Sequence, residues 1–138
     1  MQNEVILIED SSSDAELTIR VLRKKNIVKD VLWLKDGEEA IAYLQQGDLL
    51  ADNPKLILLD LKLPKVDGIS VLQEIKAHEE AKLVPVVILT SSDQEVDKIS
   101  GYMSGANSYV VKPVEYEEFQ AAIEEVGRYW LQRNTSRE

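Results

Sequence analysis

Residues 56–64 read LILLDLKLP, and this stretch indicates the fold because four large apolar residues run directly into an acidic one. An unbroken apolar run of this length is typical of a strand buried on both faces, as in a parallel sheet. Asp60 ends the run and is followed at once by Leu61, which argues against an ordinary surface turn. Ligands of open parallel sheets bind beyond the carboxyl ends of the strands, so Asp60 is the first candidate functional residue.

Four more short, largely apolar runs lie on either side of this strand, at residues 4–9, 31–34, 84–89 and 109–111. The segments between them carry apolar residues at the spacing of one helix face, which predicts a helix after each strand. In the fourth of these helices we expect Ser91-Ser92-Asp93 to form the N-terminal cap, followed by Val96, Ile99 and Met103 at helical spacing.

Five strands alternating with five helices predict a doubly wound (βα)5 α/β fold, a parallel sheet with helices on both faces. A chain of 138 residues suits one domain. We expect residues 1–133 to form that domain, with a lengthened last helix starting after Pro113, and residues 134–138 to form a polar tail.

The composition excludes several classes of function. There is no cysteine, so disulfides, thiolate metal sites and a cysteine nucleophile are excluded. A formal net charge of −9 argues against binding to nucleic acid or to an anionic membrane surface. The sequence shows no signal peptide and no apolar stretch of membrane-spanning length, which predicts a soluble, cytoplasmic protein.

Polar residues stand at the predicted ends of four strands: Glu9-Asp10, Asp60, Thr90 and Lys112. Each alone has an ordinary explanation, such as a helix cap for Asp10 or Thr90 and a solvated lysine for Lys112. Together they bring three carboxylates, a hydroxyl and an ammonium to one edge of the sheet, which points to a functional site.

Such a cluster suits a phosphoryl group. Like charges in close quarters raise one another's pKa values, and a divalent cation such as Mg²⁺ removes that penalty by binding carboxylates, water and phosphate. A carboxylate can attack phosphorus and form an aspartyl-phosphate. Phosphoryl transfer then needs mainly positioning and charge compensation, for which Lys112 and Thr90 have suitable groups.

These residues together resemble the response regulator receiver family. The matching features are the acidic pair Glu9-Asp10, Asp60 within residues 58–64, the Asp67-Gly68 turn, Thr90-Ser91, Gly105-Ala106, Tyr109 and Lys112-Pro113. The resemblance covers nearly the whole chain. It implies a flavodoxin-like fold whose five strands have the order 2-1-3-4-5.

The resemblance also implies roles for individual residues. Asp60 would accept a phosphoryl group from a histidine kinase, and Lys112 would pair with that group after a cis peptide bond to Pro113. Asp10, Glu9, Asp60 and the main-chain carbonyl of Lys62 would hold Mg²⁺. Glu9 departs from the usual aspartate by one methylene, which allows it to contact the metal through water.

A switching mechanism follows from the same resemblance. Phosphorylation of Asp60 would draw the Thr90 hydroxyl inward, and Tyr109 would turn in from solvent to fill the space. This repacks the face formed by the fourth helix, the fifth strand and the fifth helix. The plain alternative for Tyr109 is a static, half-exposed strand residue.

Two features indicate the kind of receiver. Residues 105–114 and the later Tyr129-Trp130-Leu131 resemble the single-domain response regulators paired with phytochrome-type sensor kinases. Three adjacent helical residues cannot all face one core, so at least one should be exposed, which suggests a homodimer face or a kinase-docking patch. The alternative is a C-terminal aromatic that only caps the core. No output domain follows in the sequence, so we expect output by protein contact or onward phosphotransfer.

Two rival functions stay open. A metal-dependent phosphohydrolase could use Asp60 as its nucleophile, but such enzymes often carry a second acid two residues later, where this chain has Lys62. A pseudo-receiver would bind partners without phosphorylation, although all the phosphorylation residues are present. A nucleotide-binding module is disfavoured because no glycine-rich phosphate loop occurs. We therefore expect a phosphoacceptor that assists its own phosphorylation and dephosphorylation, not an enzyme.

Overall fold

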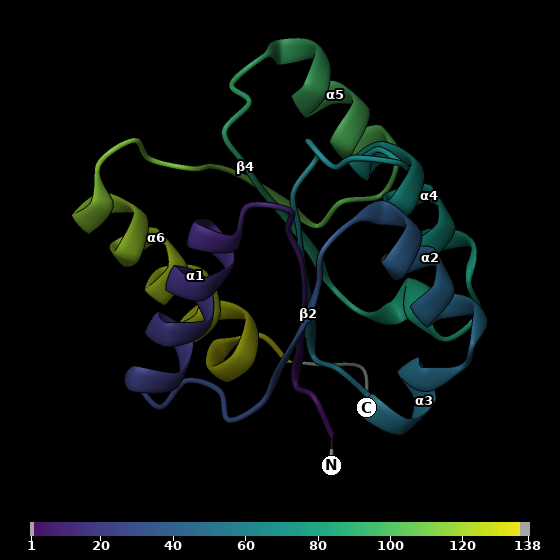
Figure 1. Ribbon diagram of the computed structural model, residues 1–138, viewed down its shortest axis with the longest axis horizontal. Coiled ribbons are helices and arrows are strands. Elements are labelled where there is room, and N and C mark those ends of the chain that lie inside the picture. The colour runs from purple at the N-terminus through teal and green to yellow at the C-terminus, as the bar shows by residue number, and fades with distance from the viewer. Residues whose placement is uncertain (1, 136–138) are drawn as a thin grey trace.

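The computed structural model describes residues 2–135 and shows a central sheet with helices on both faces (Figure 1). The strands are β1 (Val5–Ile8), β2 (Val31–Leu34), β3 (Leu56–Leu59), β4 (Val86–Thr90) and β5 (Ser108–Val111). The helices are α1 (Ser12–Lys24), α2 (Gly37–Gln45), α3 (Asp48–Asp52), α4 (Gly68–Ala77), α5 (Glu95–Met103) and α6 (Tyr116–Arg128). A 3-10 turn, η1 (Ala81–Leu83), and a π-helical turn, η2 (Tyr129–Arg133), complete the set.

All strand pairs are parallel, and the strand order is β2-β1-β3-β4-β5, which confirms the predicted fold. The register is in step across the centre of the sheet, where Ile8 pairs with both Leu34 and Leu59. The carboxyl ends of these strands therefore lie at one edge. The residues that follow them in the chain are brought together there.

Two hydrophobic cores lie on opposite faces of the sheet. Val5 and Leu7 of β1 pack into the core that α1 and α6 cover, while Ile6 and Ile8 pack into the core that α2 and α4 cover. Successive strand residues point to opposite faces, so a strand covered on both sides must be apolar throughout. This explains the unbroken apolar runs from which the fold was predicted.

Two short elements escaped prediction, namely α3 and η1. With five and three residues, they are too short to show a helical repeat of apolar residues. Gly47 and Asn53, on either side of α3, both have left-handed backbone conformations. The helix therefore begins and ends at residues with a special backbone conformation. A search for spaced apolar residues does not detect such a conformation.

Helix α5 forms where predicted, but its expected cap is wrong. The helix begins at Glu95 after Gln94, and no side chain caps its first turn. Ser92 instead turns toward the helix and donates its hydroxyl hydrogen to the carboxylate of Asp97. The spaced apolar residues of this helix face outward, with Val96 66% and Met103 84% exposed.

The C-terminal aromatic segment confirms the expectation that one residue is exposed. Tyr129 is 52% exposed, whereas Trp130 and Leu131 both pack against the core beneath α1 and α6. The wider π-helical turn rotates less per residue than an α-helix, so two adjacent side chains can reach the same core. Helical structure ends at Arg133, and residues 136–138 of the predicted tail lie outside the described residues.

Among residues 2–135, no helix combines the length and the apolar character that crossing a lipid bilayer requires.

Candidate functional site

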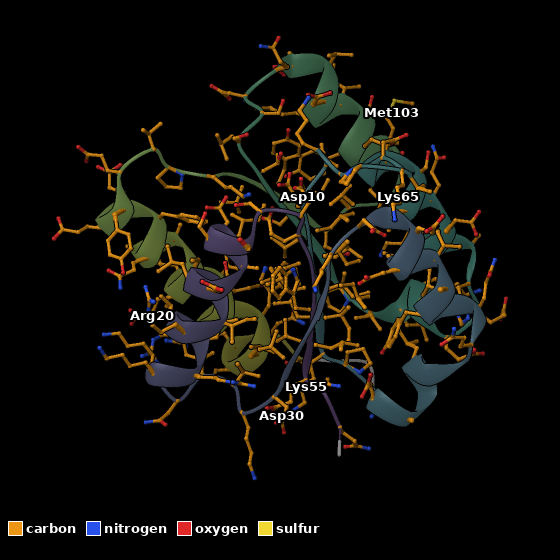
Figure 2. All side chains as sticks on the ribbon, in the orientation of Figure 1. Asp10, Arg20, Asp30, Lys55, Lys65 and Met103 are labelled. Carbon is orange, nitrogen blue, oxygen red and sulfur yellow. The ribbon has the colours of Figure 1, made fainter. Side chains whose placement is uncertain are left out.

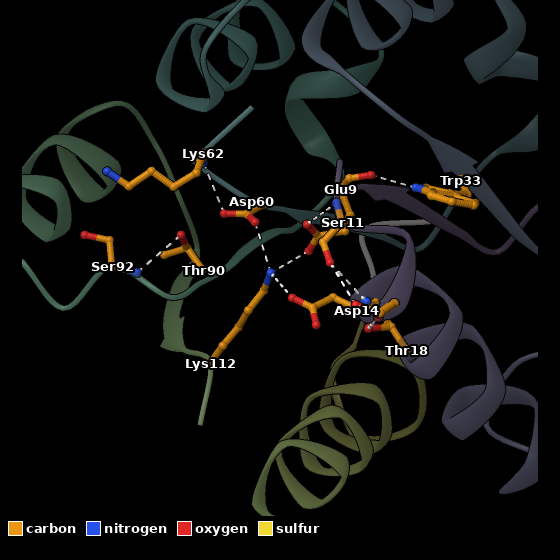
Figure 3. A network of polar contacts seen from close by, with 11 residues as sticks. Glu9, Ser11, Asp14, Thr18, Trp33, Asp60, Lys62, Thr90, Ser92 and Lys112 are labelled. Carbon is orange, nitrogen blue, oxygen red and sulfur yellow. Dashed lines mark hydrogen bonds and ion pairs between the residues drawn. The ribbon is translucent and has the colours of Figure 1, made fainter. Parts of the chain in front are cut away.

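The carboxyl edge of the sheet holds the candidate site (Figure 3). Glu9 and Asp10 follow β1, Asp60 follows β3, Thr90 ends β4 and Lys112 follows β5. Backbone hydrogen bonds continue past the strands, from the Asp60 amide to the Ile8 carbonyl at 3.0 Å and from the Lys112 amide to the Thr90 carbonyl at 2.7 Å. The sheet geometry thus extends into the site residues and aims their side chains.

The opposite edge of the sheet is far from this site. In Figure 2, Asp10 lies at the upper end of the sheet, while Asp30 and Lys55, which precede β2 and β3, lie at the lower end. Parallel strands impose this separation, because all their carboxyl ends share one edge.

Lys112 is the centre of the site. Its Nζ lies 2.7 Å from Oε1 of Glu9, 2.9 Å from Oδ2 of Asp14 and 3.0 Å from Oδ2 of Asp60. The lysine side chain is only 8% exposed. Burial would lower the pKa of Lys112, but these three carboxylates outweigh it and raise that pKa above its ordinary value. The ammonium is therefore held fully charged.

Asp60 is buried yet ionised. Burial would raise the pKa of its carboxyl, but the Lys112 ammonium, the Thr90 hydroxyl and the Lys62 amide hold that pKa below its usual range. The Lys62 amide donates to Oδ1 of Asp60 at 3.1 Å. These donors position the carboxylate and keep it in the form that can act as a nucleophile.

Glu9 behaves in the opposite way. Burial and the neighbouring charge of Asp60 raise its pKa from the ordinary 4.5 to about 7, although Lys112 and the Ser11 amide act against this. The Ser11 amide donates to Oε2 of Glu9 at 3.1 Å, and the Trp33 indole donates to the Glu9 carbonyl at 2.7 Å. Without a cation, a proton on this cluster is held more readily by Glu9 than by Asp60.

The carboxylates can hold a metal ion. Glu9, Asp10 and Asp60 each offer an oxygen, and these oxygens lie within 4.8 Å of one another. Asp10 is exposed while Glu9 and Asp60 are buried, so the group is open to solvent on one side. An all-oxygen donor set with room for water fits Mg²⁺ or a similar hard cation, and a divalent charge would relieve the repulsion that raises the pKa of Glu9.

Thr90 and Tyr109 lie on the side of the site toward α5. Thr90 is fully buried at the end of β4 and is a hydrogen-bond partner of the Asp60 carboxylate. The Tyr109 ring is half-buried, and its hydroxyl donates to the Ser92 carbonyl at 2.9 Å. Ser92 in turn contacts Asp97, which lies 3.7 Å from the Lys62 ammonium. The β4–α5 loop thus links the candidate site at the carboxyl edge of the sheet to the start of α5.

The prediction of a cis peptide bond before Pro113 is wrong, since no peptide bond in the described residues is cis. The trans form is favoured by about 0.5–1 kcal/mol before proline even without other constraints. Lys112 reaches its three carboxylates from a trans backbone, so its position does not require the cis form.

One site residue, Asp14, was missed in the sequence. It lies in the first turn of α1, which follows directly from β1 and so begins at the same edge of the sheet. The signal was available, because the first turn of any helix that follows a strand stands beside the strand's carboxyl end. Ser11 caps α1 by accepting from the Asp14 amide.

Comparison with known proteins points to one family. A sequence model of the response regulator receiver domain matches residues 5–124. The probable methanogenesis regulatory protein FilR2 of Methanothrix harundinacea is 38% identical over 133 residues, covering 96% of this chain and 86% of that protein. Response regulator Rcp1 of Synechocystis sp. is also 38% identical over 133 residues, covering 95% of this chain and 90% of that protein.

Solved structures agree with these relatives. The phosphorylated cyanobacterial phytochrome response regulator RcpA superposes with a TM-score of 0.90 at 34% identity, with all of both chains covered. The Mn²⁺-bound form of Rcp1 superposes with a TM-score of 0.88 at 39% identity, covering 98% of this chain and 99% of that one.

Proposed function

This chain belongs to the response regulator receiver family, and on that premise we propose that Asp60 is its phosphoacceptor. The chain is a two-component response regulator, similar over nearly its whole length to Rcp1 and RcpA. The observation that carries the proposal is the Asp60 carboxylate, which is buried, ionised and held between the Lys112 ammonium and the Lys62 amide.

The reaction is a transfer from phosphohistidine to aspartate. An oxygen of Asp60 forms a bond to phosphorus as the P–N bond of the donor breaks, and the bonding electron pair stays with the imidazole nitrogen. Lys112 and the Thr90 hydroxyl stabilise the negative charge on the transferred phosphoryl oxygens. Because Lys112 is only 8% exposed, its charge acts with little screening by water.

We assign the metal of this site to Mg²⁺, held by Asp10, Asp60, Glu9 and the main-chain carbonyl of Lys62. When bound, the ion supplies charge compensation for the phosphoryl oxygens. The three carboxylate oxygens within 4.8 Å of one another support this assignment, as does the Mn²⁺ bound by the related Rcp1. The amide of Lys62 already contacts Asp60, which keeps this backbone segment beside the site.

Phosphorylation would act on the side of the site toward α5. Thr90 turns toward the phosphoryl group, Tyr109 gives up its bond to Ser92 and enters the space that Thr90 leaves, and α5 shifts with the β4–α5 loop. The outer face of α5 is apolar, with Val96, Ile99, Tyr102 and Met103 all exposed. A protein partner that binds these side chains would distinguish the phosphorylated from the unphosphorylated protein.

The kinase partner we propose is a phytochrome-type sensor histidine kinase. Receiver domains work with sensor kinases, and RcpA, which superposes along the whole chain, is a phytochrome response regulator. The homodimer at the C-terminal aromatic residues stays a prediction. Tyr129 is the exposed residue there, since Trp130 and Leu131 pack inward.

The experiment that tests phosphoacceptor function is intact mass spectrometry after incubation with acetyl phosphate and Mg²⁺. We expect the mass of one phosphoryl group on wild type and none on Asp60→Asn or in EDTA. Asp30→Asn, at the opposite edge of the sheet, is the matched control and should be phosphorylated like wild type.

Transfer from the phosphorylated kinase domain of a phytochrome-type sensor completes the test. If neither donor adds a phosphoryl group to wild type, the phosphoacceptor proposal is rejected and the pseudo-receiver takes its place. If Asp60→Asn is phosphorylated as well as wild type, another residue is the acceptor.

A further inference from the structure

Helix α1 adds a third carboxylate beside Lys112. Asp14 is the third residue of α1, and its Oδ2 accepts from the Lys112 Nζ at 2.9 Å. Its side chain is 33% exposed, whereas the side chains of Lys112, Glu9 and Asp60 are 8%, 4% and 6% exposed. Asp14 therefore contacts the ammonium from the open side of the site.

The three partners of Lys112 differ in their other contacts. Glu9 and Asp60 belong to the carboxylate group that can hold a cation, together with Asp10, and Asp14 does not. An ammonium has three hydrogens to donate, and here carboxylates accept all three. A divalent ion would draw the Glu9 and Asp60 oxygens toward itself. Asp14 would then remain as the carboxylate partner of the Lys112 ammonium.

Asp14 is held firmly enough to serve as an anchor. Its amide donates to the Ser11 hydroxyl at 3.3 Å, and its carbonyl accepts from the Thr18 hydroxyl at 2.8 Å. Helix α1 itself buries five side chains: Ala15, Leu17, Thr18, Val21 and Leu22. The backbone that carries the Asp14 carboxylate is thus fixed by a capped and well-packed helix.

We propose that Asp14 is a positioning residue that holds the Lys112 ammonium at the phosphoryl site when Glu9 and Asp60 turn to the metal. One hydrogen of the ammonium stays on Asp14, and the other two are free to donate to phosphoryl oxygens. This inference rests on the proposed phosphoacceptor function. It predicts that removing the Asp14 charge weakens the phosphorylated state without weakening metal binding.

The test uses beryllofluoride, a tetrahedral mimic of a phosphoryl group on a carboxylate, titrated calorimetrically into the whole chain with saturating Mg²⁺. We expect Asp14→Asn to raise the dissociation constant for beryllofluoride about threefold to tenfold, as for loss of one partly exposed charge-assisted hydrogen bond. Mg²⁺ titrated alone should bind Asp14→Asn at least as tightly as wild type, because Asp14 is not among the metal ligands.

Two further variants separate positioning from a general effect. Glu16→Gln removes the same charge from an exposed place on α1 and should leave beryllofluoride binding unchanged. In a Lys112→Ala background, Asp14→Asn should cause no further loss, because the residue acts through the lysine. Circular dichroism checks that each variant is folded.

Each outcome decides a different question. Equal or tighter beryllofluoride binding by Asp14→Asn overturns the inference, and so does a further loss in the Lys112→Ala background. Weaker Mg²⁺ binding by Asp14→Asn overturns it as well and makes Asp14 part of the metal site. Failure of wild type to bind beryllofluoride, with Mg²⁺ bound, counts against the proposed function instead.

Discussion

Helices α1 and α5 both follow strands that end at the site, yet they are attached to the domain in different ways. Helix α1 has 13 residues, buries five side chains and is capped by Ser11. Helix α5 has nine residues, lacks a side-chain cap, and Gly101 is its one buried residue. Both helices carry an acid that contacts a site-edge lysine, Asp14 to Lys112 and Asp97 to Lys62.

The difference separates the fixed part of the site from the part that can move. Helix α1 packs on α6 so closely that a Cβ at Gly127 would lie 2.6 Å from Cδ2 of Leu22. Helix α5 turns Val96, Ile99 and Met103 outward, so their apolar area contributes little to its attachment. A helix with few buried contacts opens or shifts at lower free energy. This difference fits a molecule in which α1 helps to position the phosphorylation site and α5 forms the surface that changes on phosphorylation.

The largest expected effect comes from truncating one apolar side chain on each helix. Leu22→Ala on α1 should lower the free energy of unfolding by about 2–5 kcal/mol, because a fully buried side chain leaves a cavity. Ile99→Ala on α5 should change it by less than about 0.5 kcal/mol, because the side chain is exposed. Urea unfolding of both variants measures the difference, and equal losses would contradict the division.

The next effect is a pH dependence that we assign to the α1 side of the site. In metal-free protein the pKa of Glu9 rises from 4.5 to about 7 on folding, so the folded state binds more protons between these values. The stability that this group contributes is fully present below pH 4.5 and is lost as the pH rises to 7. The loss is on the order of 3 kcal/mol.

Urea unfolding in EDTA at several pH values measures this slope, the change in the free energy of unfolding with pH. Glu9→Gln should remove most of it, because the amide does not titrate. Glu16→Gln, the same charge change at an exposed place on α1, separates loss of the buried carboxylate from loss of one negative charge. A Glu9→Gln variant that keeps the wild-type slope would show that another group is responsible.

A smaller effect is expected in amide hydrogen exchange of the unmodified protein. The opening free energy of α5 amides should be lower than that of α1 amides by about 1–2 kcal/mol, a roughly tenfold difference in protection. The reason is that α5 has one buried residue and α1 has five. Exchange followed by NMR gives both sets of values in one sample, and equal protection would remove the basis for calling α5 the movable side.

The smallest effect is expected from Tyr109→Phe. This change removes the hydrogen bond from the tyrosine hydroxyl to the Ser92 carbonyl and should cost about 1 kcal/mol or less. Amide chemical shifts should change in the β4–α5 loop and α5 and stay constant in α1. Shift changes that spread into α1 would mean that the two sides are coupled more tightly than their packing indicates.

Much of the fold could be predicted because buried parallel strands leave a strong pattern. The apolar run that became β3 was located to the residue, since a strand covered on both faces has no polar positions. Most residues of the site could also be predicted to lie together, because each stands at the end of a strand: Glu9, Asp10, Asp60, Thr90 and Lys112. The direction in which α5 turns its apolar residues could not be predicted, since helical spacing shows that a face exists and not what covers it.

The sequence by itself determined the α/β alternation, the edge at which the site forms and most of the residue types gathered there, because periodicity and strand ends are local properties of the chain. Only the tertiary structure decided which charges touch. Asp14 joins Lys112 across 98 residues, and folding lowers the pKa of the Asp60 carboxyl while it raises the pKa of Glu9. Hydrogen bonds and pKa values depend on distances of a few ångströms and on burial, and these exist only when the strands and helices are packed together.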